Sequence, residues 1–255
     1  MNSSKKGHLE HVGVIGMHWG IRRFEDKTAD NGRVVALKKG ESAQNMSANP
    51  NLTLQKNKML YVSANTRDML AYRGEYADQL RFMRNVNKVF AYKVTAVEDL
   101  VSPGKKERID EFIRLTGKDK TVFDQMGESN FKTGALFTNL SKYLGITSSQ
   151  KVSEKYRKLV DSKDPKDHEK AFLAFSSYFP VDPVNRKKYF DAIKKKGYNA
   201  LYDDNDISGG YQSKSSLIIL NSGKSVKITG KEMDNQRATD RAYSEFLKEQ
   251  WNSKG

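Results

Sequence analysis

The segment KKKGYNALYDDNDISGGYQSKSSLIILNSGKSVKI, residues 194–228, contains the pattern that decides the fold. Residues 198–202 and 216–220 are apolar and aromatic runs of the length typical of strands, and a polar stretch separates them. Residues 221–223 predict a turn, and residues 225–228 predict another strand directly after it. Short strands joined by polar turns therefore predict a sheet in this part of the chain.

The rest of the chain alternates short strands with helices. Residues 65–83 predict a helix, because apolar side chains recur there with the helical period. Proline in Asp164-Pro165 divides the helical pattern of 151–179 into two helices. Residues 41–58 are polar, with a turn at 49–50. We expect further strands at 34–37, 59–63 and 86–97, a turn at 102–104, and helices at 105–116, 185–196 and 231–251.

This interleaving, without regular strand–helix–strand spacing, predicts an α+β fold: a mixed sheet of short strands with surrounding helices. We expect three parts: a flexible N-terminal arm at 1–33, an α+β domain at 34–230 and a C-terminal helix at 231–255.

Composition excludes several classes of site. The chain has no cysteine, which excludes disulfides, thiolate catalysis and cysteine-ligated metals. It has no P-loop, no G-x-G-x-x-G and no G-x-S-x-G motif. No stretch approaches the roughly 18 apolar residues of a membrane span, so we expect no membrane association and an intracellular compartment. The 45 Lys and Arg against 31 Asp and Glu give a net charge of +14, which favours a polyanionic neighbour.

We predict no metal site. Asp204, Asp206, Ser208 and Gly209 match the first half of a calcium-binding loop, but the bidentate acid expected later falls on Ser215. A solvated turn is the better interpretation of this loop. His8 and His11 in the arm could share a helical face, with His18 nearby, but a zinc site would need a third strong ligand and Glu10 is the only local acid.

The predicted helix at 185–196 is very basic. Its only acid is Asp191, and Gly197 predicts its C-cap. Such a helix can contact phosphates without reading sequence; the alternative is a solvated helix face. Aromatic residues do not interleave the cations, so the pattern does not indicate base stacking. The candidate phosphate or nucleic-acid contacts are Arg186, Lys187, Lys188, Lys194, Lys195 and Lys196.

Residues 9–23, LEHVGVIGMHWGIRR, resemble an N-terminal signature of head-associated proteins of tailed bacteriophages, which often reads HYGVKGMKWGVRR. The resemblance implies a role in virion morphogenesis. The indole of Trp19, the thioether of Met17 and the guanidinium groups of two arginines are suited to docking on a phage capsid or portal protein. The alternative is an arm packed on its own domain. The candidate partner-binding residues are Met17, Trp19, Arg22 and Arg23.

The body, about 34–230, resembles mono-ADP-ribosyltransferase-like domains through the order of residues 39–40, 60–63, 196–206 and 216–221. Members place an Arg on the first strand, a Ser on the second and E-x-E before a late strand. Here the first strand, near 40–46, has Gln44 and no Arg, and Ser63 stands in the second. Residues 212–216, QSKSS, supply no acid. The resemblance therefore implies a degenerate transferase scaffold that has lost its chemistry.

We accordingly expect a minor, non-enzymatic virion protein without a cofactor, found in the virion and in the host cytoplasm during assembly or after ejection. It would be packaged with DNA, whose charge is opposite to its own. The alternative is an active transferase that uses NAD to modify a host protein, with Ser63, Arg73 and Glu75, or an acid among 203–206, as candidate catalytic residues. A third interpretation is a prophage remnant that binds nucleic acid.

Overall fold

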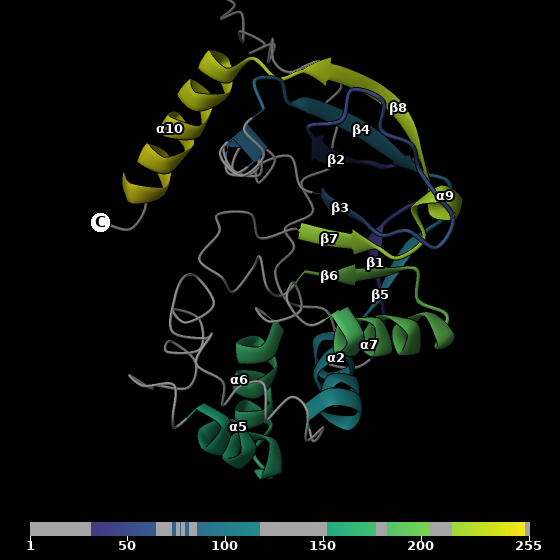
Figure 1. Cartoon of the computed structure of the whole chain (residues 1–255), viewed down its shortest axis with the longest axis vertical. Coiled ribbons are helices and arrows are strands. Elements are labelled where there is room, and N and C mark those ends of the chain that lie inside the picture. The colour runs from purple at the N-terminus through teal and green to yellow at the C-terminus, as the bar shows by residue number, and fades with distance from the viewer. Residues whose placement is uncertain are drawn as a thin grey trace, which may run out of the picture.

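The computed structural model describes residues 32–64, 73–74, 77, 80–81, 86–117, 152–176, 183–203 and 216–252. This part of the chain forms two antiparallel sheets and several helices, which confirms the α+β class (Figure 1). The expected mixed sheet is wrong, because every pairing between the described strands is antiparallel. No helix in these ranges has both the length and the apolar character needed to cross a membrane.

The larger sheet has six strands in the order β6-β7-β3-β2-β4-β8. β2 (Ser42–Ser47) lies near its centre. It falls within residues 41–58, a polar stretch in which composition predicted a turn and no strand. Apart from Met46 its residues are small or polar, but β3 and β4 pair with it on both sides, so position and not intrinsic propensity keeps it extended. The remaining strands are β3 (Leu60–Ser63), β4 (Phe90–Ala96), β6 (Ala200–Tyr202), β7 (Ser216–Ile219) and β8 (Val226–Met233).

The smaller sheet consists of β1 (Arg33–Leu37) and β5 (Leu100–Pro103). The predicted turn at 102–104 is wrong for its first two residues, since Ser102 and Pro103 end β5 and pair with β1. This sheet packs against one face of the larger one. The shared apolar cluster includes Ala36, Leu37 and Leu100 from the small sheet, and Ala43, Val62, Val94, Leu217 and Ile219 from the large one.

A helical layer covers the other face at the β6–β7 end (Figure 1). Leu201 and Ile218 pack there against aromatic residues of the helices, among them Phe112 and Tyr189. The predicted break at Asp164-Pro165 is confirmed, because one helix ends at Asp161 and the next begins at Pro165. The layer consists of α2 (Lys105–Phe112), the π-helical turn η1 (Ile113–Gly117), α5 (Val152–Asp161), α6 (Pro165–Ser176) and α7 (Pro183–Lys195).

At the other end of the same face, a second apolar cluster joins the sheet to the helix around 73–81. Ala77 is fully buried against Met46 and Ala91. The described residues of this predicted helix are helical; Met69, Tyr72, Tyr76 and Met83 lie outside the described residues.

The C-terminal part begins with a short helix, α9 (Ser222–Ser225), at the predicted turn, and continues into β8. The final helix is α10 (Gln236–Asn252). The expected start of this helix at 231 is wrong, because β8 continues to Met233 and residue 230, where we placed a domain boundary, lies inside that strand.

Candidate functional site

A row of polar side chains crosses the middle of the larger sheet. Gln44 of β2 lies directly opposite Ser63 of β3, and Ser63 lies opposite Ser216 of β7. Direct partners in antiparallel strands project from the same face of a sheet. Ser63 is fully buried and Ser216 is 2% exposed. Gln44 and Ser63 are the positions to which the sequence resemblance assigns the first two transferase motifs, and Ser216 ends the stretch to which it assigns the third.

The three central positions of this row, Gln44, Ser63 and Ser216, carry an amide and two hydroxyls. On the other side of Gln44 the row continues to Lys93 of β4, and beyond Ser216 the backbone N–H of buried Asp203 donates to the Ser216 carbonyl at 2.9 Å. Gln44 Oε1 is buried and has no hydrogen-bond partner. Residues 212–215 lie outside the described residues, and no Arg stands among the described positions of the row.

Arg73, a candidate for the transferase alternative, takes part in a cluster of ion pairs at the β8 end of the sheet. Its guanidinium lies 2.6 Å from Glu232 and 3.6 Å from Asp234. The Asp234 side chain is completely buried; Arg81 also donates to it, and Thr239 donates to it at 2.5 Å. Arg73 therefore joins the helix around 73–81 to β8 and to the start of α10. Glu75, the other candidate on this helix, lies outside the described residues.

The basic run forms α7 and the residue after it. Tyr189, Phe190 and Ile193 are buried in the helical layer, which turns the cations between them toward the opposite side of the helix. Gly197, at φ +82°, ends the helix as predicted for a C-cap. Arg186 is half-buried, whereas Lys187, Lys188 and Lys195 are exposed. The structure thus brings most of the predicted phosphate contacts to one helix face.

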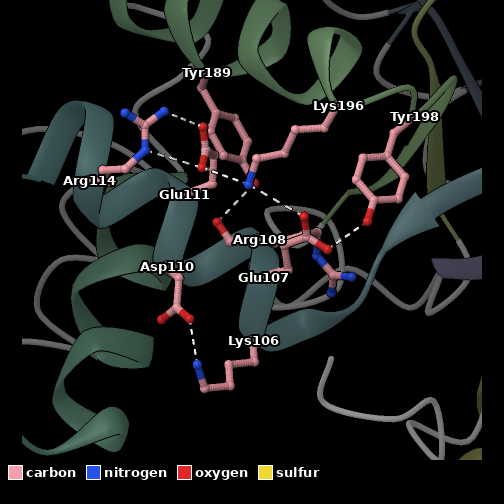
Figure 2. A network of polar contacts seen from close by, with 9 residues as sticks. All are labelled: Lys106, Glu107, Arg108, Asp110, Glu111, Arg114, Tyr189, Lys196 and Tyr198. Atoms are coloured by element: carbon pink, nitrogen blue, oxygen red, sulfur yellow. Dashed lines mark hydrogen bonds and ion pairs between the residues drawn. The ribbon is translucent and has the colours of Figure 1, made fainter. Parts of the chain in front are cut away.

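Lys196 is separate from this face. Just past the end of α7 it turns toward α2, where its ammonium lies 2.9 Å from Glu111 and 3.4 Å from Glu107 (Figure 2). Arg114 donates to the same Glu111 carboxylate at 2.5 Å, and the Tyr198 hydroxyl donates to Glu107 at 2.6 Å. Lys196 therefore fastens the end of α7 to α2; its contact with phosphate stays a prediction.

The charges in this network shift its titration. Hydrogen bonding by Arg114 and Lys196 lowers the pKa of Glu111 despite its burial, and the Glu111 carboxylate raises the pKa of Lys196. Burial, together with the hydrogen bond to Glu107, raises the pKa of Tyr198 to about 12. At neutral pH the network therefore contains a charged Glu111 carboxylate and a protonated Tyr198 phenol.

The base of the arm is attached next to the same network. The carbonyl of Gly32 accepts from the backbone N–H of Gly104, the N-cap of α2, at 2.8 Å. Arg33 donates to the Gly197 carbonyl at 2.8 Å, and its guanidinium lies 5.1 Å from the centre of the Tyr198 ring. The arm therefore leaves the domain beside the C-terminal end of α7. Met17, Trp19, Arg22 and Arg23 lie outside the described residues.

The described residues contain no group of three or more acids or histidines that would hold a metal ion. The calcium-like loop, from Asp204 to Ser215, lies outside them.

Sequence reasoning missed two features of these sites. Glu107 and Glu111 are four residues apart on a predicted helix, so they could have been identified as neighbours, but nothing in the sequence linked them to Lys196. Asp234 gave no signal at all, because it lies in a charged stretch that we predicted to be helical.

Comparison with protein-family models, with curated proteins and with solved structures gives no match. The phage signature and the transferase resemblance accordingly stay predictions from the sequence.

Proposed function

We propose that the chain is a non-enzymatic, head-associated minor protein of a tailed bacteriophage, which its N-terminal arm attaches to a capsid or portal protein. The observation that carries the proposal is the signature-like segment at 9–23, with its tryptophan, its paired arginines and its glycines. The protein would then be present in the virion, and in the host cytoplasm during assembly or after ejection.

Two features of the domain support a non-enzymatic role. The central polar row has Gln44 at the position where the transferase resemblance requires an arginine. Arg73, the candidate replacement for this arginine, already pairs with Glu232 and Asp234. A transferase must also stabilise an oxocarbenium-like transition state with a carboxylate. The side chains of Gln44, Ser63 and Ser216 do not provide that negative charge, so the transferase alternative would have to use an acid among 203–206, of which Asp203 lies next to Ser216.

The first test is mass spectrometry of gradient-purified virions from the phage or induced prophage that encodes the chain. Stoichiometric peptides are the expected result. Absence from virions, with abundance in infected cells, would overturn the proposal. Cleavage of NAD by the purified protein would in turn favour the transferase alternative.

The arm is tested by Trp19→Ala, because a buried aromatic anchor commonly contributes 2 kcal/mol or more, roughly, to an interface. We expect the variant to be incorporated into virions at least about ten-fold less than the wild type. Lys6→Ala, in the same arm but outside the signature, is the matched control. Equal incorporation of the two variants would exclude docking through the signature.

A further inference from the structure

The strands of the larger sheet are not joined equally well. In the part of the chain that the structure describes, β2 and β3 pair at a single position, Gln44 opposite Ser63. On its other side β2 pairs with β4 along its whole length, and β3 pairs in the same way with β7. The boundary between β2 and β3, which we call the seam, is therefore the least tightly paired boundary of the described sheet.

A side chain replaces part of the missing ladder at the seam. Asn45 of β2 donates from its amide nitrogen to the backbone carbonyl of Tyr61 in β3 at 2.8 Å. Asn45 is 7% exposed, yet its Oδ1 has no hydrogen-bond partner among the described residues, and neither has the buried Oε1 of Gln44. A buried amide oxygen without a partner costs desolvation energy, which is recovered when water reaches it. The polar links described across the seam are thus few, and opening hydrates two orphaned oxygens.

The helices that cover one face of the sheet are also divided at the seam. The helical layer packs on this face against Ile218 of β7, whereas the helix around 73–81 packs against Met46 of β2 and Ala91 of β4. The two apolar clusters lie toward opposite ends of the face (Figure 1). Tyr61 of β3, directly opposite Ile218, belongs to neither cluster and is 37% exposed. Among the described residues, no apolar cluster therefore bridges the seam on this face.

The opposite face of the sheet is continuous across the seam. The apolar cluster shared with the small sheet contains Val62 of β3 and Leu217 of β7, together with Ala43 of β2 and Val94 of β4. Apolar packing on this face thus joins the strands on both sides of the seam, whereas the helical face lacks such a join in the described residues. Separation of β2 from β3 is therefore expected to be widest on the helical face.

We propose that the larger sheet is hinged at the seam. One lobe consists of β6, β7 and β3 with the helical layer, and the other consists of β2, β4 and β8 with the helix around 73–81. The lobes rotate apart on the helical face about the shared apolar cluster, as in other hinge motions. This opening breaks the Gln44–Ser63 pairing and the bond from Asn45, and it leaves the β2–β4 and β3–β7 ladders intact. It also gives water access to the polar row at Gln44, Ser63 and Ser216.

The hinge is independent of the proposed function, because it is measured on the purified protein and does not require docking in a virion. Unchanged incorporation of Trp19→Ala would leave the hinge untouched. A sheet that opens only as a whole would likewise leave the arm untouched.

The first experiment is native-state hydrogen exchange of the full-length protein, followed residue by residue by NMR. Successive residues of an antiparallel strand direct their backbone groups to alternate neighbours. The Tyr61 carbonyl faces β2, so the amide of Ser63 also faces β2, whereas that of Val62 faces β7. After correction for intrinsic rates, the Ser63 amide should exchange at least about ten-fold faster than the Val62 amide. Equal rates would mean that β3 is released only as a whole, and the hinge would be wrong.

The second experiment repeats the measurement on Asn45→Asp, which replaces the donor at the seam with an oxygen that repels the Tyr61 carbonyl. The Ser63 amide should exchange at least about ten-fold faster than in the wild type. The matched control is Ser42→Ala, which removes a buried hydroxyl of the same strand that lies 2.7 Å from Thr95 Oγ1 on the β4 side.

This control lowers the overall stability, so it should accelerate exchange of the Val62 amide and leave the Ser63 amide unchanged, because the seam opens before the whole fold does. Acceleration of both amides by the same factor in Ser42→Ala would show that only global unfolding exposes Ser63. That result, or an unchanged Ser63 rate in Asn45→Asp, would overturn the hinge.

Discussion

Two charged regions of the molecule use the same residue types in opposite ways. Around Asp234, ion pairs are enclosed: the carboxylate is completely buried, and the Arg73 and Arg81 side chains are only 15% and 14% exposed. On α7, the Lys187–Asp191 pair is solvated, with 78% of the lysine side chain exposed. Breaking an enclosed pair leaves a desolvated charge, whereas breaking a solvated pair returns both groups to water. The first region is therefore expected to contribute strongly to the stability of the fold, and the second only weakly.

The largest effect expected from this contrast is that of Asp234→Asn. The substitution keeps the shape of the side chain but leaves two largely buried guanidinium groups without their shared carboxylate. We expect unfolding free energy to fall by about 3–5 kcal/mol, measured by urea denaturation. Asp110→Asn is the control, because Asp110 pairs with Lys106 of α2 at the protein surface. This substitution should change the unfolding free energy by less than about 0.5 kcal/mol. A loss for Asp234→Asn no larger than that of the control would contradict the contrast.

An intermediate effect is expected for Glu111→Gln, because the carboxylate is 4% exposed while its partners Arg114 and Lys196 are 63% and 41% exposed. Loss of charge-assisted hydrogen bonds should lower the unfolding free energy by about 1–3 kcal/mol at neutral pH.

The pH dependence of this difference follows from the lowered pKa of Glu111. A carboxyl whose pKa is lower in the folded state stabilises the fold above its usual value of 4.5, and that stabilisation is lost as the pH falls through the lower folded-state value. The difference between wild type and Glu111→Gln should therefore shrink below pH 4.5. A difference that stays constant from neutral to acidic pH would show that the charge of Glu111 is not its cause.

The smallest effect on stability is expected for Asp191→Asn. Both lysines that contact Asp191 return to water, so the unfolding free energy should change by no more than about 0.5 kcal/mol. Urea denaturation of this variant alongside Asp234→Asn measures the contrast between the two regions directly. Large destabilisation would instead place Asp191 with the fold-maintaining charges of the first region.

Elements whose own residues determine them were predictable from the sequence. After Ser216, β7 is an apolar run whose residues are buried on both faces, and α7 combines a helical period with a glycine stop that the structure confirms at φ +82°. The composition of residues 41–58 did not predict β2. The extended form of this strand depends on its two neighbouring strands and not on its own residues, which are mostly small or polar.

The candidate sites were less predictable, since they depend on contacts between distant segments. The sequence grouped Lys196 with its lysine neighbours because they are adjacent in the chain. In the structure the Lys196 side chain extends toward α2, where its ammonium forms ion pairs with Glu107 and Glu111. Similarly, the link between Arg73 and Asp234 joins segments that no local pattern connects. The sequence shows where the cations are, but tertiary packing decides which of them pair with acids from distant segments.

The position of β3 in the larger sheet also has a consequence for synthesis of the protein on the ribosome. β3 pairs on one side with β2, which lies close in sequence, and on the other with β7, roughly 150 residues later. At about 5–20 residues per second, the nascent chain exposes the unpaired edge of β3 for on the order of ten to thirty seconds before β7 is made. An open strand edge can pair with other chains during that time. The order of the strands thus leaves one strand edge open to association with other chains until β7 is synthesised, whatever the stability of the finished fold.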